Sequence, residues 1–129
     1  MAKIKVKVEK TRTGFSAYAE KYAAFTTGKT VNELTTNMVE ALNVLFEAEQ
    51  KKKEVTKADI TFEMDLMSIF EVYPVINMKG LSARVGMNYS LLAQYATGKK
   101  KPSSRQTALI MDSIHELGRE LSELNLITR

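Results

Sequence analysis

The chain has 129 residues, of which 44% are apolar and 26% charged, and it contains no cysteine. This length fits one compact domain or two small ones. The missing cysteines exclude disulfide frameworks, thiolate zinc sites and cysteine nucleophiles. The first residues alternate charged and apolar side chains, unlike a signal peptide, and no run of about 18 apolar residues occurs. We therefore expect a protein of the cytoplasm.

The net charge of +4 is distributed unevenly. Residues 1–65 are nearly balanced, whereas residues 66–129 carry eight basic and five acidic side chains. Between Lys79 and Arg105 there are six cations and no acid: Lys79, Arg84, Lys99, Lys100, Lys101 and Arg105. A local field of one sign suits a phosphate-binding surface, although a solvated basic face would give the same pattern.

Three short strands are predicted near the N-terminus. Residues 3–10 alternate polar and apolar side chains with a period of two, which is typical of a half-buried strand. Residues 11–14 then form a turn and residues 15–19 a returning strand. A third extended piece closes at Gly28.

One helix and one further strand complete this half. Thr30 and Glu33 have capping-box spacing, and apolar residues at three- and four-residue intervals continue towards Gln50. Lys51–Lys53 are interpreted as a basic helix end and a solvated loop. Alternation in residues 60–65 predicts the last strand. The order is therefore β-β-β-α-β, with one helix on a small sheet.

From Leu66 onward the apolar pattern becomes helical. One face is expected to carry Leu66, Ile69, Phe70 and Tyr73, up to a break at Pro74. The sequence thus predicts an α+β domain over residues 1–65 and an all-α domain over residues 66–129.

Residues 77–105 contain two short helices separated by a sharp turn. Asn77 is a good N-cap for a helix that ends at Val85, and Gly86 can adopt the positive φ that the turn needs. Asn88 caps a second helix that reaches Ala96, in which Leu92 and Tyr95 are expected to face the core. A basic loop follows, and Ser103 with Gln106 has capping-box spacing for a final long helix.

This stretch resembles the helix-turn-helix of the Xre/Cro/C1 type, through Leu81–Asn88 and the loop Gly98–Pro102. The resemblance implies a recognition helix in the major groove of DNA. The expected base contacts are Asn88, Tyr89, Ser90, Leu91 and Gln94. The expected phosphate contacts are Lys79, Lys99, Lys100 and Lys101. The alternative is a helical hairpin that serves only protein contacts.

The last helix has a heptad-like apolar seam formed by Ile110, Ile114, Leu117, Leu121 and Leu124. Because palindromic operators require two-fold symmetric proteins, we expect a homodimer or a higher homo-oligomer, formed through this seam or through the N-terminal sheet. Packing on its own domain would give the same seam. His115, the single histidine, is interpreted as structural or solvent-facing. No metal, cofactor or catalytic residue is expected.

Three short motifs in the N-terminal half resemble the HicB antitoxin family: Gly14–Tyr18, Thr27–Thr30 and Glu40-Ala41. That family joins a truncated ribonuclease-H-like β-β-β-α-β domain to a DNA-binding domain. The resemblance implies an antitoxin that neutralises a HicA-type toxin and represses its own operon. A stand-alone regulator whose first half oligomerises or senses, and a protein-interaction adaptor without DNA binding, are the alternatives.

Overall fold

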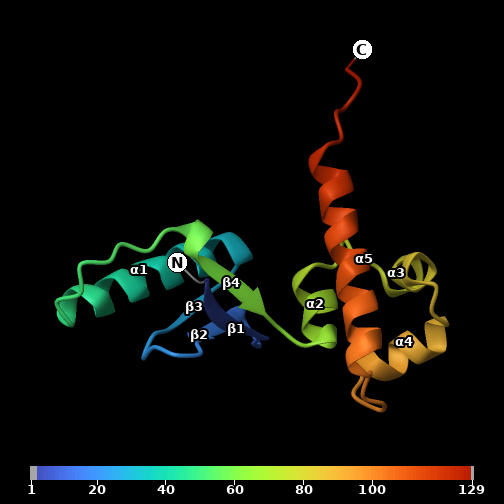
Figure 1. The fold of residues 1–129 in the computed structure, drawn as a ribbon, viewed down its shortest axis with the longest axis horizontal. Coiled ribbons are helices and arrows are strands. Elements are labelled where there is room, and N and C mark those ends of the chain that lie inside the picture. The colour runs from blue at the N-terminus through green and yellow to red at the C-terminus, as the bar shows by residue number, and fades with distance from the viewer. Residues whose placement is uncertain (1–2, 129) are drawn as a thin grey trace. The chain divides into compact units, whose positions relative to one another are not determined.

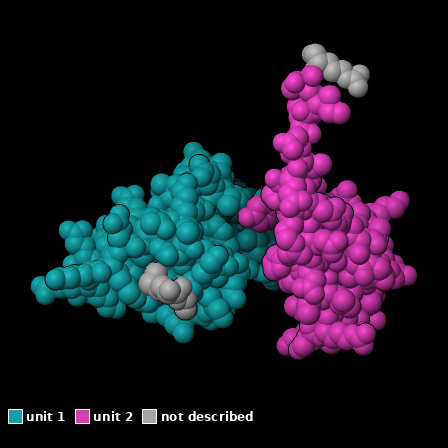
Figure 2. Space-filling view, turned by 45° about the horizontal axis from the view of Figure 1, so that its top comes forward, with its two compact units in different colours: residues 1–72 teal, residues 73–129 magenta. Residues whose placement is uncertain are grey.

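A computed structural model describes residues 3–128 and divides the chain into two compact units, residues 1–72 (unit 1) and 73–129 (unit 2) (Figure 2). The division falls seven residues after the boundary expected at residue 65, because the helix over residues 66–72 lies with unit 1 and contacts its first strand. Within the described residues, no helix combines the length and the apolar character needed to cross a membrane.

Unit 1 is built on a four-stranded mixed sheet (Figure 1). Its strands are β1 (Ile4–Lys10), β2 (Phe15–Ala19), β3 (Phe25–Gly28) and β4 (Ile60–Glu63), in the spatial order β3-β2-β1-β4. The first three form an antiparallel meander, and β4 runs parallel to β1. A parallel pair requires a crossover, which here contains helix α1 (Val31–Ala48).

Helix α1 packs on the sheet, with contacts to β2 and β3, and supplies a third of the buried core residues of unit 1. Four of its residues at helical spacing are buried: Leu34, Met38, Leu42 and Phe46. The strands bury alternate residues against them, among them Val6, Val8, Ala17 and Ala19. The structure thus confirms the expected α+β class, a sheet domain followed by an all-helical part.

Both ends of α1 follow from local chemistry. The Thr30 hydroxyl accepts a hydrogen bond from the Glu33 amide at 3.0 Å, as the cap spacing predicted. At the other end the helix stops at Ala48, because Gln50 adopts a left-handed conformation with φ of 57°. The Lys51 amide then donates to the Phe46 carbonyl, which closes a Schellman turn. The lysines Lys51–Lys53 therefore follow the helix and do not lie in its last turn.

Two asparagines of α1 hold neighbouring backbone. Asn43 accepts from the Val55 amide at 2.7 Å and donates to the Val55 carbonyl at 3.0 Å, which anchors the chain just before the η1 turn (Lys57–Asp59) that leads into β4. Asn37 donates to the Thr27 carbonyl of β3 at 2.9 Å. These bonds fix the two ends of the crossover to the helix.

Helix α2 (Leu66–Val72) begins where the Asp65 carboxylate accepts from the Ser68 amide. The expected apolar face was wrong in detail. Ser68 and Val72 are buried, whereas Leu66, Ile69 and Phe70 are half-buried and Tyr73 is exposed beyond the helix. The helix ends at Val72 because the residue preceding Pro74 disfavours helical φ and ψ.

Over residues 73–128, unit 2 contains three helices, α3 (Met78–Val85), α4 (Tyr89–Ala96) and α5 (Ser104–Ser122). Helix α3 contacts both α4 and α5 (Figure 1). The small core of this unit is formed by Leu81, Ser82, Leu92, Ala96 and Ile110.

Candidate nucleic-acid interface

Helices α3 and α4 are joined by a turn of two residues beyond the Gly86 cap. The Asn77 side chain accepts from the Gly80 amide at the start of α3. At its end Gly86 has φ of 78°, and the amides of Gly86 and Met87 both donate to the Ser82 carbonyl, at 3.0 and 2.9 Å. The chain thereby reverses direction within a few residues and places α4 against α3. Both helices have the bounds that their caps predicted.

Ser82 lies buried in α3, with 5% of its surface exposed. Its hydroxyl donates to the Lys79 carbonyl at 2.7 Å, so the polar atom is satisfied inside its own helix. A side chain this small permits close approach of neighbouring helices. The serine therefore serves as a packing residue, as expected for a small side chain at a position where related helix-turn-helix sequences usually have alanine.

Helix α4 divides into a packed face and an exposed face. Leu92 and Ala96 are buried, while Tyr89 keeps 52% of its surface exposed. Ser90 is also exposed, and Leu91 and Gln94 are half-buried. The predicted base-contacting side chains of this helix therefore remain accessible to different degrees.

The N-cap of α4 constrains another predicted contact residue. The side-chain oxygen Oδ1 of Asn88 accepts from the Ser90 amide at 2.8 Å, which leaves the side-chain NH₂ as the group free to reach a ligand. Asn88 itself is exposed.

Tyr95 was expected in the core but is half-buried, and its hydroxyl donates to the Gln106 side chain. Gln106 completes the capping box of Ser103 at the start of α5. The tyrosine thus ties the end of α4 to the beginning of α5 across the basic loop. The sequence offered capping spacing for Gln106 but no signal for this cross-helix bond.

The loop after α4 presents the lysines. Gly98 has φ of 79°, and the Lys100 amide donates to the Gln94 carbonyl at 3.1 Å. The backbone of this loop is therefore bonded to the end of α4. Lys99, Lys100 and Lys101 are all exposed.

The six cations of this region divide into one paired and five unpaired groups. Arg84 forms an ion pair with Glu120 of α5. Among the residues that the structure describes, the others make no ion pair: Lys79, Lys99, Lys100, Lys101 and Arg105. These five exposed cations lie in α3, in the loop that follows α4 and at the start of α5, and they give unit 2 the positive field that phosphates require.

The apolar seam of α5 is used unevenly. Ile110 is 3% exposed, and Ile114 and Leu117 are half-buried. Leu121 is 54% exposed, and Leu124, 70% exposed, lies beyond the helix end at Ser122. The first part of the seam therefore packs on its own unit, and a continuous five-residue helical seam is not formed.

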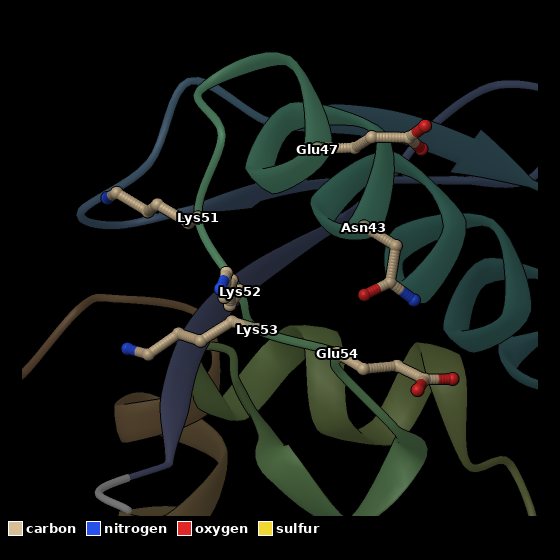
Figure 3. Close-up of a pocket in the computed structure, with 6 residues that line it drawn as sticks. All are labelled: Asn43, Glu47, Lys51, Lys52, Lys53 and Glu54. Carbon is tan, nitrogen blue, oxygen red and sulfur yellow. The ribbon is translucent and has the colours of Figure 1, made fainter.

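Other polar groups form no comparable arrangement. His115 is exposed, and within residues 3–128 no three acidic or histidine side chains gather as a metal site would require. A hollow of about 530 Å³ lies at the end of α1 (Figure 3). It is open, and its lining amide, Asn43, is already bonded to Val55.

No protein-family model matches the chain, and no curated protein matches it.

Proposed function

We propose that the chain is a sequence-specific transcriptional repressor that binds double-stranded DNA through α3 and α4. The observation that carries this proposal is the capped helix pair around the left-handed Gly86, with an exposed N-terminal face on α4 and five unpaired cations in α3, in the loop after α4 and at the start of α5. The resemblance to Xre/Cro-type helix-turn-helix sequences supports the same function.

In this proposal α4 enters the major groove with its first turns towards the base edges. Gln94 pairs with an adenine edge through two hydrogen bonds, and Ser90 and the Asn88 amide reach bases or phosphates. Tyr89 and Leu91 contact a thymine methyl group or sugar. The phosphate contacts are Lys79, Lys99, Lys100 and Lys101, which position the protein without reading sequence.

A palindromic operator would be bound by a homodimer. Ile110 is buried in the core of its own unit and is therefore not available to a second copy. The surface that remains is formed by the half-buried Ile114 and Leu117 and by the exposed Leu121 and Leu124. Light scattering on Leu121→Glu tests this: a dimeric wild type and a monomeric variant are expected, and an unchanged mass would contradict the assignment.

We also propose that the repressor is a HicB-like antitoxin, in which unit 1 binds a HicA-type toxin. Support comes from the three N-terminal motifs and from the β-β-β-α-β order, with β4 parallel to β1. Co-expression with the product of a small neighbouring gene tests it. Absence of a stable complex would contradict the antitoxin proposal and leave the proposal of a stand-alone transcriptional regulator.

DNA binding is tested with a fluorescent duplex from the promoter of the gene itself and a shuffled duplex of equal composition. We expect tighter binding to the promoter and a steep loss of affinity with salt. Four phosphate contacts per subunit predict a slope of log K against log salt of roughly −3.6 per subunit. Equal binding to both duplexes, or affinity that ignores salt, would contradict the proposal.

A further inference from the structure

Two aromatic side chains lie next to each other on the exposed face of the unit 1 meander. Tyr18 of β2 and Phe25 of β3 are register partners, so their side chains project from the same side of the sheet. Their exposed fractions are 42% and 65%. The residues flanking Tyr18, Ala17 and Ala19, are buried on the opposite face, against which α1 packs. The aromatic pair therefore faces away from the core.

Lysines of β1 lie on the same face. Lys7 is the register partner of Tyr18, which makes it the next side chain in the row, and Lys5 follows two residues along the strand. Both are exposed. The row across the sheet thus runs from Phe25 through Tyr18 to a lysine.

The meander as a whole is strongly basic. Residues 3–30 contain two acids and seven cations: Lys3, Lys5, Lys7, Lys10, Arg12, Lys21 and Lys29. The rest of the sheet domain, residues 31–65, has four cations and eight acids. Within the described chain, none of the seven meander cations forms an ion pair. The charge balance of the first half conceals this separation.

We propose that the β1–β3 face of unit 1 binds single-stranded nucleic acid, with bases stacked on Tyr18 and Phe25 and phosphates held by Lys5 and Lys7. Exposed aromatic rings give stacking surfaces for unpaired bases, and adjacent unpaired cations neutralise the backbone. A polyanion matches the excess charge better than a protein of mixed charge does. Duplex DNA does not present its base faces, so it cannot use the rings.

Acids on this face limit where the nucleic acid can lie, and one of them, Glu9, follows Lys7 by two residues on β1. Lys7 is also the register partner of Glu63 on β4, so the far side of the sheet is less favourable for phosphates. The nucleic acid is therefore placed over β2 and β3, with β1 as its border. This site goes beyond the proposed operator binding and lies in a different unit.

The experiment measures the anisotropy of fluorescent 15-nucleotide oligo-U and oligo-dT with the full chain, at several salt concentrations. Tyr18→Leu with Phe25→Leu keeps the apolar surface and removes the aromatic faces. We expect at least about fivefold weaker binding for each ring removed. Tryptophan at both positions should retain the affinity. Lys5→Gln with Lys7→Gln should weaken binding and reduce the slope of log K against log salt by roughly 1.4.

Separate outcomes overturn this inference and the proposed function. Oligonucleotide affinity unchanged by the leucine pair overturns the inference, even if promoter binding is intact. A second outcome also overturns the inference: the wild-type chain does not bind oligonucleotides and instead self-associates through this face, and Tyr18→Ser and Phe25→Ser abolish that self-association. Conversely, replacing Lys99–Lys101 with glutamine should weaken duplex binding and preserve oligonucleotide binding.

Discussion

The left-handed conformation of Gly86, in the turn between α3 and α4, can be tested by comparison with Gly118 of α5. Alanine substitution is expected to change stability in opposite directions at these two glycines. A Cβ atom added to Gly86 or to Gly118 would meet no atom of a residue elsewhere in the fold within 4 Å, so overlap with packed neighbours plays no part at either position. The two differ in backbone conformation: Gly86 has φ of 78°, whereas Gly118 lies within α5.

Gly86→Ala should destabilise unit 2. An alanine in the left-handed conformation lowers the free energy of unfolding by roughly 1–2 kcal/mol. The reduced entropy of the unfolded chain offsets about 0.4–1 kcal/mol of this loss. The net loss is on the order of 1 kcal/mol, which lowers the melting temperature of a unit this small by about 8 °C. Gly86→Asn should cost less, because asparagine tolerates this conformation. Gly118→Ala should stabilise the helix by about 0.5–1 kcal/mol.

Thermal unfolding followed by circular dichroism measures these shifts, and hydrogen exchange of the Leu92 amide assigns them to unit 2. Promoter affinity of Gly86→Ala, measured well below its melting temperature, should stay close to that of the wild type. If both alanine variants move the melting temperature in the same direction, the assignment of φ as the cause is refuted.

Three further changes test the interface and the crossover. Gln94→Ala should cost about 1–3 kcal/mol of promoter affinity and relax selectivity at one base pair, measured against a set of single-base operator variants; uniform loss across the set would count against base readout. Replacing Lys99–Lys101 with glutamine should weaken binding to all duplexes and reduce the salt slope by roughly 2.7, and an unchanged slope would remove these lysines from the phosphate contacts. Asn43→Ala should destabilise unit 1 by about 1–3 kcal/mol in denaturant unfolding, because both backbone groups of Val55 lose their partner; a neutral effect would mean that water replaces the amide.

Features governed by neighbouring residues were predictable from the sequence. The caps Thr30, Asn77, Asn88 and Ser103 all accept the hydrogen bonds that their spacing indicates. The left-handed turn at Gly86 also follows from local chemistry, because it depends on a few consecutive residues. Helix starts were for this reason located more accurately than the end of α1, where a glutamine adopts the conformation usually left to glycine.

Features that depend on partners distant in sequence were not predictable. The periodicity of α2 suggested Leu66 and Phe70 for burial, yet the neighbours of the helix bury Ser68 and Val72. In α5 the seam looked uniform, but its contact with α3 buries Ile110 and leaves Leu121 exposed. For the candidate interface, spacing identified the exposed side of α4, while the bond from Tyr95 to α5 required the fold.

The hydrogen bond from Asn37 to Thr27 bears on the resistance of the protein to aggregation at high concentration. Strand β3 is at the edge of the sheet, where unpaired backbone groups invite another chain to add a strand. It is only four residues long, and a side chain of α1 already occupies one of its carbonyl groups. The Thr27 carbonyl is therefore less available to a strand from another chain that pairs with this edge. Loss of this one amide, as in Asn37→Ala, should therefore appear as faster aggregation before it appears as lower stability.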